Sequence, residues 1–471
     1  MPNIWTTIQW VSHEFGLHSV YHLGLDGQLV ILARTTRMLA YGACSLIIAL
    51  LFSALNFSDS RIGLFFTLTL AGDVLLTTVF TLTADHFGRR RSLLLGSFLM
   101  VCSGLVFVVF DNYWILLLAA VVGVISATGS DFGPFRAIEE SILSHLTTAE
   151  TRPSVFAWYV TLSSLGSALG TEASGRVVDW LSGFDGWSMA NAYHAVFWFY
   201  VVMGLANMVF IASMTKGVEI NGTKGSNQEE RSEMLLEEMQ EEELGEPARQ
   251  SEDEGRGGLD TKSMAGDSSN PRFAQISSDT RAIMFKLWPL LVVDSLADGM
   301  VGYSLTTYYL AQRFRAATST LGDITSISYF FSATSTVFAG PLANRLGLVN
   351  TMVFTHLPSS IAVLIFPAAP NLVISVLLFF IRTGFNNMDQ APRAAFIAAA
   401  VKPEERTAVN GITSVLRTLA ATAGPSVTGL LADHDKFWIA FVTAGTLRIS
   451  YDLGLWMLFT NVRINERGSR S

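Results

Sequence analysis

The chain has 471 residues, of which 50% are hydrophobic and only 15% are charged, and its mean hydropathy is +0.40. This composition excludes an ordinary soluble globular protein. The formal net charge of −8 says little about partners, because much of it comes from one acidic segment, and we expect no nucleic-acid partner.

The apolar residues fall into repeated runs long enough to cross a bilayer, which requires about 20 residues of helix. We predict twelve spanning helices, at about 37–56, 62–84, 92–110, 114–143, 154–178, 192–214, 284–310, 321–343, 350–368, 372–400, 408–432 and 437–460. The fold class is therefore an all-α membrane protein with two six-helix bundles, at 37–214 and 283–460.

Residues 1–36 precede the first predicted span. Trp5, Ile8, Val11 and Phe15 lie at roughly helical spacing, whereas His13 does not suit the apolar core of a signal peptide. We expect an N-terminal cytoplasmic lead-in that lies on the membrane surface.

Basic residues predict the orientation, because they are enriched in cytoplasmic loops. One side of the predicted membrane carries Arg34, Arg37, Arg89, Arg90, Arg91, Arg152, Arg345, Lys402, Arg406, Arg463, Arg467 and Arg470, and the other carries Arg61, Arg176, Arg313, Arg315 and Lys436. Both termini, including the tail 461–471, and the central loop are therefore expected in the cytoplasm. No targeting signal is readable, which favours the plasma membrane over an internal one.

The segment 215–282 separates the bundles and is rich in Glu, Gly, Ser and Asn. It cannot bury enough apolar surface to offset the entropy of ordering, so we expect an acidic, disordered cytoplasmic linker. A passive tether is favoured over a regulatory or trafficking segment.

The two halves repeat each other around an Asp-x-x-Pro inside an apolar helix, at Asp131 and Pro134 and again at Asp389 and Pro392. Further along, the halves align without a gap. This alignment pairs Gly175 with Gly429 and Asp179 with Asp433, and a second stretch pairs Gly63 with Gly322. The repeat predicts two pseudo-symmetric bundles with a substrate held between them.

The turn after the second span reads Ala84, Asp85, His86, Phe87, Gly88, Arg89, Arg90, Arg91, and the turn after the eighth reads Leu342, Ala343, Asn344, Arg345, Leu346, Gly347. These turns resemble the signature loops of the major facilitator superfamily. The resemblance covers nearly the whole chain and implies alternating access around a central cavity lined by spans 1, 4, 7 and 10.

The resemblance also implies a gating loop made of Asp85, Gly88, Arg89, Arg345 and Gly347, in which the glycines allow tight turns and the charges hold one conformational state. The sequence departs from the family pattern at Thr81, Thr83, His86 and Asn344. The alternative is that the arginines only set the topology.

Span 11 contains Gly424 and Pro425, resembling a motif that drug/proton antiporters of this superfamily carry in span 5. Span 5 of this chain lacks the proline, so support for an antiporter is partial. Close packing of helices through small residues explains the motif equally simply.

Ionisable side chains are costly inside a bilayer, so they face a partner or a wet cavity. The predicted spans contain Asp73, Asp131, Arg136, Glu172, Asp294, Asp298, Arg382, Asp389, Arg393, Arg417, Arg448 and Asp452. Three opposite-charge pairs at i,i+4 can neutralise themselves on one helix face: Asp389 with Arg393, Arg136 with Glu140, and Arg448 with Asp452. For the last pair we expect a purely structural role.

Asp294 and Asp298 are also at i,i+4 but carry the same charge, and two close carboxylates in a low-dielectric site resist being ionised together. We predict that these two residues, with Asp73 and Glu172, are proton-coupling candidates. The alternative for the pair is that each carboxylate meets an arginine, Arg382 or Arg417.

Pro134 and Pro392 should bend their helices, because each removes a backbone hydrogen-bond donor. Irregular backbone at membrane depth is tolerated where it lines protein or water. We therefore predict a substrate cavity lined by Asp131, Arg136, Arg382, Asn386, Asp389 and Arg417, which suits a small charged or zwitterionic solute.

The sequence thus predicts a secondary active transporter, proton-coupled and monomeric, with direction open between uptake and efflux. No phosphate-binding loop, zinc-ligand cluster or catalytic constellation is recognisable, so we expect no enzyme activity, cofactor or metal. The rival is a transporter-like sensor or scaffold that signals through the acidic linker. Deleting residues 220–275 should abolish the function of a sensor and leave the flux of a transporter intact.

Overall fold

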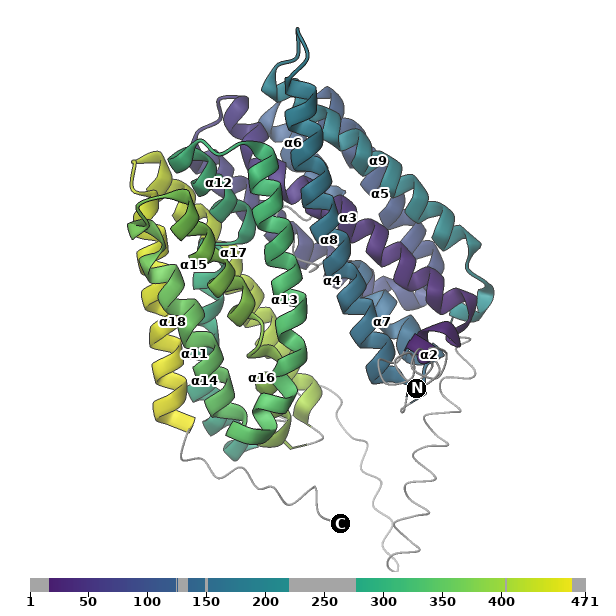
Figure 1. Cartoon of the computed structure of the whole chain (residues 1–471). Coiled ribbons are helices and arrows are strands. Elements are labelled where there is room, and N and C mark those ends of the chain that lie inside the picture. Colours follow the sequence, from purple (N-terminus) through teal and green to yellow (C-terminus); the bar gives the residue numbers. More distant parts are fainter. Residues whose placement is uncertain are drawn as a thin grey trace, which may run out of the picture.

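The computed structural model describes residues 17–123, 125, 134–148, 151–219, 277–402 and 405–459. Asp131, the residues before Leu17, most of the acidic linker and the C-terminal tail lie outside the described residues, as does the side chain of Asp85. The described residues form helices joined by short turns. They are arranged as two bundles that lean against each other (Figure 1).

The first bundle consists of α2 (Leu17–Tyr21), α3 (Gly24–Ala54), α4 (Asp59–Phe87), α5 (Arg89–Val109), α6 (Tyr113–Val122), α7 (Pro134–Leu146), α8 (Arg152–Ser182) and α9 (Met189–Ser213), and is followed by the short 3-10 helix η1 (Lys216–Val218). The second bundle consists of α11 (Ser278–Met300), α12 (Tyr303–Phe314), α13 (Thr318–Leu346), α14 (Leu348–Ile365), η3 (Phe366–Ala368), α15 (Leu372–Asn386), α16 (Gln390–Ala400), α17 (Arg406–Asp433) and α18 (Phe437–Phe459).

Several helix starts follow from their capping residues. The Asn112 side chain accepts a hydrogen bond from the Trp114 backbone amide at 3.0 Å, and Asn371 accepts one from Ile374 at 3.0 Å. Such caps satisfy amides that have no partner within the helix. The same two positions therefore mark where spans 4 and 10 begin.

Spans 7 and 10 are interrupted helices, and the helices described in span 4 are α6 and α7. Span 7 breaks between Met300 and Tyr303, and span 10 breaks between Asn386 and Gln390. The break in span 10 precedes Pro392, which lies in the first turn of α16, whereas we expected the proline to bend a continuous helix. Proline is tolerated in a first turn because the amide it lacks has no helical partner there.

The first span starts earlier than the hydropathy predicted. α3 begins at Gly24, so residues 24–36, expected to precede the membrane, belong to its first long helix. Arg34 and Arg37 interrupt the apolar run in the sequence, which moved the predicted start to residue 37. Both arginines are buried in the folded chain.

Five of the described helices are individually long and apolar enough to cross a membrane by length and composition: Gly24–Ala54, Asp59–Phe80, Arg89–Val109, Met189–Ser213 and Leu348–Ala368. Other spans fall short because they carry ionisable residues in mid-helix or are broken. Among them, α11, α15 to α16, and α18 supply the buried aspartates and arginines of the second bundle.

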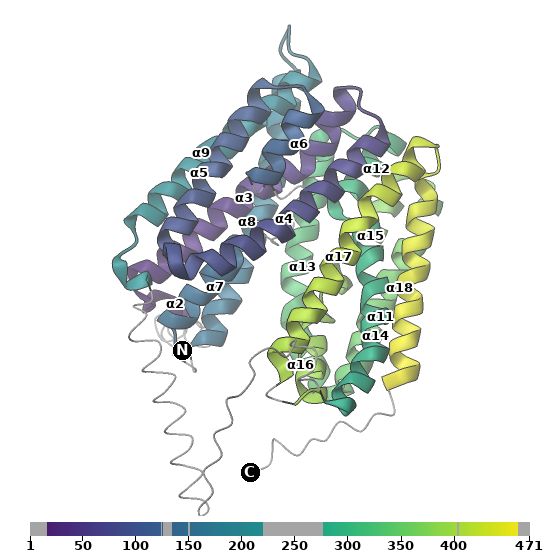
Figure 2. The ribbon, with the colours of Figure 1, turned by 180° about the vertical axis from the view of Figure 1, so that it is seen from behind.

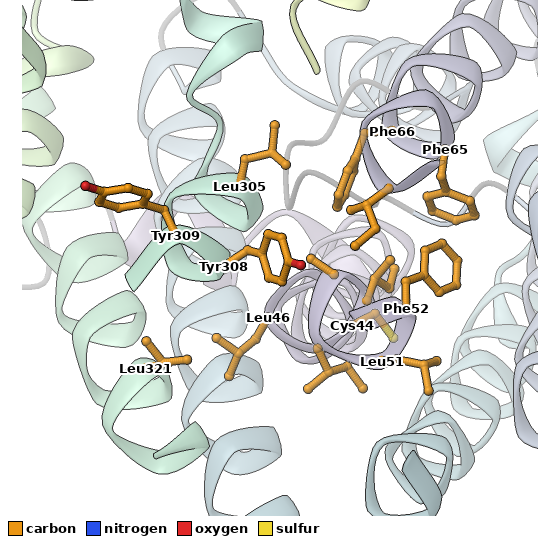
Figure 3. Packing of buried hydrophobic residues seen from close by; sticks show 14 of the residues in the cluster. Cys44, Leu46, Leu51, Phe52, Phe65, Phe66, Leu305, Tyr308, Tyr309 and Leu321 are labelled. Atoms are coloured by element: carbon orange, nitrogen blue, oxygen red, sulfur yellow. The ribbon is translucent and has the colours of Figure 1, made fainter. Parts of the chain in front are cut away.

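The bundles meet at one end, which we call the closed end, and their ribbons diverge toward the opposite end, where α2, α7 and α16 lie (Figures 1 and 2). At the closed end one hydrophobic cluster draws residues from both bundles. Figure 3 shows Leu46 and Phe66 of the first bundle beside Leu305, Tyr308 and Leu321 of the second.

Two helix crossings at the closed end are formed by glycines that the sequence repeat pairs with each other. A Cβ added to Gly63 of α4 would collide with backbone around Gly429 of α17, and one added to Gly175 of α8 would lie 3.2 Å from the Cα of Gly322 in α13. The repeat pairs Gly63 with Gly322 and Gly175 with Gly429, so the two crossings are equivalent. The absence of side chains lets the helix backbones approach closely.

Polar contacts across the closed end follow the same symmetry. Ser60 donates to the Asp433 carboxylate at 2.6 Å, and the Ser319 amide donates to the Asp179 carboxylate at 2.9 Å. A further bond runs from the Tyr308 hydroxyl to Asp59 at 2.6 Å. The repeat therefore builds a two-fold set of contacts that joins the bundles.

Candidate functional site

A buried ionic cluster lies in the first bundle and consists of Arg34, Arg37, Glu139 and Tyr159. Arg37 donates to both oxygens of Glu139, at 2.7 and 2.8 Å, and the Tyr159 hydroxyl donates to Glu139 at 2.9 Å. The Arg34 guanidinium stacks 3.9 Å from the Tyr159 ring. Arg34 and Arg37, which we expected to flank the membrane, are therefore buried inside the bundle, where the single charge of Glu139 on α7 offsets one of their two.

A larger polar cluster lies in the second bundle. This second-bundle cluster consists of Asp294, Asp298, His356, Ser360, Arg382, Asn386, Asp389, Arg393, Arg448 and Asp452, contributed by α11, α14, α15, α16, α18 and the α15–α16 turn. Seven of these ten side chains are charged or titratable and have less than a tenth of their surface exposed; the other three are Asp298, Ser360 and Asn386. Burial on this scale requires mutual pairing.

Arg448 and Asp452 do not pair with each other, contrary to the expectation from their spacing. Arg448 Nη1 lies 3.1 Å from Asp298 Oδ1 on α11, whereas Asp452 Oδ1 lies 2.7 Å from His356 Nδ1 on α14. An i,i+4 spacing only permits a pair, and neighbouring helices offered each residue a closer partner. The expected pair is thus replaced by contacts that tie three helices together.

The two aspartates of α11 occupy different environments. The Asp294 side chain is 1% exposed and lies 3.6 Å from both His356 and Arg393, whereas the Asp298 side chain is 35% exposed. Each carboxylate therefore does approach an arginine, but neither Arg382 nor Arg417 is the one. Asp298 is the acid through which this cluster reaches a solvent-accessible surface.

Arg382 stabilises the break in span 7. Its guanidinium donates to the Val301 carbonyl and, at 2.8 Å, to the Thr306 hydroxyl. A cation beside the carboxyl end of α11 satisfies carbonyls that the interrupted helix leaves unpaired. The two broken spans, 7 and 10, thus support each other through this side chain.

The remaining span 10 residues join the same network. Asp389 pairs with Arg393 at 2.9 Å, as the i,i+4 spacing predicted, and the Asn386 side chain accepts a hydrogen bond from Arg448. Arg417, on α17, is only partly buried and donates to Ser295 at 3.0 Å. Four of the six predicted cavity residues thus lie in or beside the second-bundle cluster.

Other predicted site residues lie elsewhere. Asp73 is buried in α4, and Arg136 is an exposed side chain that pairs with Glu140 at 2.6 Å, as its spacing predicted. Glu172 pairs with Arg176, which also reaches Asp323 of the other bundle at 3.0 Å. Glu172 therefore belongs to the closed-end contacts rather than to the second-bundle cluster.

The predicted gating loops form tight turns. Gly88 and Gly347 have φ angles of +96° and +85°, which favour glycine, and each separates two spanning helices. The buried Arg89 begins α5, where its amide donates to Glu219 at 2.8 Å, whereas Arg345 is exposed at the end of α13. Glu219 was not predicted as a member of this turn.

Sequence reasoning also missed Glu139 and His356. Glu139 is adjacent to Glu140, whose i,i+4 spacing from Arg136 attracted attention instead. His356 lies in mid-span with Ser360 one turn later, and an ionisable residue at membrane depth is itself a functional signal. The position of His356 within a predicted span would therefore have been enough to identify it as a candidate site residue.

Comparison with known proteins agrees with this architecture. The family model described as Major Facilitator Superfamily matches residues 30–259 and 287–469. An uncharacterized membrane protein of Saccharomyces cerevisiae is 31% identical over 431 residues, covering 90% of this chain and 92% of the relative.

Similar solved structures are transporters. A D-xylose–proton symporter is 15% identical with a TM-score of 0.66, covering 91% of this chain and 97% of its own. The nucleoside transporter NupG is 12% identical with a TM-score of 0.64, and the match covers 93% of this chain and 99% of the NupG chain. The match to the family model over most of the residues, together with this fold, shows that the chain is a membrane transporter of the major facilitator superfamily.

Proposed function

We propose that this protein is a secondary active transporter that moves a small charged or zwitterionic solute by alternating access and couples that movement to protons. The observation that carries the proposal is the second-bundle cluster, where acids, arginines and a histidine are buried within spanning helices. Charges at this depth are costly, and proton or substrate pathways are a common reason for their presence.

Alternating access requires two conformations in which opposite ends of the protein close. The polar contacts that join the bundles at the closed end, such as Ser60 with Asp433 and Ser319 with Asp179, are hydrogen bonds that can break and form again. The positive-inside rule assigns the diverging end to the cytoplasm, because Arg89, Arg90 and Arg345 lie there. In this orientation the conformation described is closed toward the outside, and we place the protein in the plasma membrane.

For the solute we propose a site between the bundles. Among the described residues, Asp298 of the second-bundle cluster and the nearby Arg417 are partly exposed charges, so they are the groups that would contact the solute. Arg382, Asn386 and Asp389 would position them, and Asp131 and Arg136 remain proposed contributors from the first bundle. One acid and one arginine suit a solute that carries both charges.

The names of the similar structures do not choose the solute. They include a nucleoside transporter, a D-xylose–proton symporter and a bacterial homologue of the iron transporter ferroportin in an inward-facing state. Their identities of 12–15% support the fold alone. The proposal for a charged solute therefore depends on the side chains of this chain.

Thermal stabilisation of the purified protein by a solute panel, at acidic and neutral pH, tests the proposal. We expect a charged or zwitterionic solute to raise the unfolding temperature of the wild type, and Asp298→Asn and Arg382→Ala to lose the effect. Asp185→Asn, at an exposed aspartate between α8 and α9, is the matched control and should keep it. A solute whose stabilisation survives both cluster variants would contradict the proposed site.

A further inference from the structure

His356 lies at the centre of the second-bundle cluster, with 2% of its side chain exposed. Its Nδ1 is 2.7 Å from Asp452, and its Nε2 is 2.7 Å from Arg448 Nη2 and 3.6 Å from Asp294 Oδ1. The Tyr451 ring packs edge-on against it at 5.5 Å. Both ring nitrogens thus face charged groups contributed by α11 and α18.

These contacts determine the protonation state of the imidazole. A guanidinium can only donate, so Nε2 accepts from Arg448 and carries no proton. The ring proton is therefore on Nδ1 and is donated to Asp452, whose second oxygen accepts from the Ser360 hydroxyl at 2.7 Å. His356 is neutral in this conformation, and Asp452 fixes its tautomer.

The buried charges of the second-bundle cluster balance each other. Three buried carboxylates, Asp294, Asp389 and Asp452, face three buried guanidinium groups, Arg382, Arg393 and Arg448. Asp298 and Arg417 are both partly exposed and add one charge of each sign. A proton that binds within the cluster therefore needs a carboxylate beside it to offset its charge.

Asp294 supplies the partner that a protonated ring would need. Its Oδ1 is buried and makes no hydrogen bond among the described residues, although it lies 3.6 Å from His356 Nε2. Arg393 approaches the other oxygen, Oδ2, at 3.6 Å. An unsatisfied buried carboxylate oxygen is costly, and an imidazolium N–H would satisfy it.

We propose that His356 is the proton-binding site of the coupling mechanism and takes its proton on Nε2. The inference deepens the proposed function and rests on it. Protonation converts Nε2 from acceptor to donor, so the hydrogen bond from Arg448 is lost and a bond to Asp294 forms. Deprotonation reverses both changes, and the bond from Nδ1–H to Asp452 is kept in both states.

Arg448 transmits the change toward the solute. After the bond to His356 is lost, the Arg448 guanidinium still contacts Asp298 on α11 and Asn386 at the end of α15. Asp298 is partly exposed, and Asn386 adjoins the break in span 10. Proton binding at His356 therefore alters the electrostatic field at the proposed solute site, while Arg382, bonded to Val301 and Thr306, faces the break in span 7.

Nuclear magnetic resonance of full-length protein with 15N-labelled histidine tests the assignment without a substrate. The chain has eight histidines, and Ser360→Ala identifies the His356 signal because Ser360 lies 3.3 Å from Nδ1. We expect the Nδ1–H tautomer at alkaline pH and a titration that protonates Nε2. An Nε2–H tautomer, or a ring whose state never changes with pH, would overturn the proposal.

Two variants separate coupling from simple burial. Asp294→Asn removes the negative charge that attracts the proton, so the His356 titration should move to lower pH, whereas Asp59→Asn at the closed end should leave it unchanged. An unmoved titration in Asp294→Asn would contradict the assignment.

The proton flux of the wild type is measured separately, in liposomes that contain a pH-sensitive dye and are exposed to the solute panel. A titrating His356 without solute-driven proton movement would overturn the proposed function. Proton movement that persists at wild-type rate in His356→Gln would overturn this inference alone. His434→Gln, at an exposed histidine, is the matched control and should transport normally.

Discussion

At the scale of single residues, adjacent glutamates on α7 have opposite environments. Glu139 is 1% exposed and neutralises Arg37, whereas the Glu140 side chain is 33% exposed and pairs with the exposed Arg136. Breaking a buried ion pair leaves an uncompensated charge, but exposed pairs contribute little. Position on the helix therefore decides what each carboxylate contributes.

Glu139→Gln should destabilise the first bundle strongly, because Arg37 then lacks its counter-charge. The expected cost is about 3–5 kcal/mol of unfolding free energy. Thermal unfolding of the purified protein measures it, and Glu140→Gln is the control, with an expected effect of about 0–1 kcal/mol. Equal effects of the two substitutions would contradict the buried position of the Arg37–Glu139 pair.

Residue-scale prediction from sequence succeeded where partners share a helix. The Asp389–Arg393 and Arg136–Glu140 pairs follow from i,i+4 spacing, and both are present. Arg448 was assigned the wrong partner because its acid, Asp298, is distant in sequence. Spacing along one helix carries no information about which face of another helix packs against it.

At the scale of elements, acids at helix starts tie the ends of the central loop to the bundles. Glu219 accepts from the amide of Arg89 at the start of α5. Glu405 accepts from the Ser277 amide at 2.9 Å, just before α11. Both carboxylates lie where the helix dipole favours negative charge.

Acidification should weaken the Glu405 contact. Hydrogen bonds from Thr280, and then from Ser277, lower the pKa of Glu405 below its usual 4.5. A lowered pKa in the folded state means that the stabilisation is present above the usual pKa and is lost as pH falls through the lowered value. Glu405→Gln should therefore flatten the decline of unfolding temperature below about pH 4.5, and a decline identical to the wild type would contradict this.

The close crossing of α4 and α17 holds the closed end together. Gly63→Leu should force these helices apart, because its side chain would meet backbone around Pro425 and Gly429. Alkylation of Ser426→Cys, in a chain without native cysteines, reports the opening, since Ser426 bonds to Thr67 at 2.8 Å in the closed end.

We expect faster alkylation in Gly63→Leu. Gly411→Leu on α17 is the matched control, because no other part of the described chain lies within 4 Å of its Cβ position. Equal alkylation rates in the two variants would show that the glycine crossing does not hold this end closed.

At the scale of the whole molecule, the repeat in the sequence predicted the two bundles. Its equivalent residues form equivalent contacts, since Gly63 meets Gly429 and Gly175 meets Gly322. The sequence did not predict which end is closed. Both conformations of an alternating-access protein use one sequence, and they differ only in which reversible contacts are formed.

Other whole-molecule features escaped prediction for a related reason. The start of α3 at Gly24 was obscured by Arg34 and Arg37, which lower local hydropathy although both contact Glu139 in the folded bundle. Hydropathy evaluates each residue alone, whereas the membrane meets only the outer surface of the assembled bundle. Charges with interior partners are therefore misread as segment ends.

The central claim is that solute movement is coupled to protons through the second-bundle cluster. Liposomes that contain the protein and a pH-sensitive internal dye, exposed to gradients of charged and zwitterionic solutes, test it most directly. We predict an internal pH change with at least one solute, abolished by Asp298→Asn and retained in Asp185→Asn. Movement of a solute across these membranes without any change of internal pH would contradict the account.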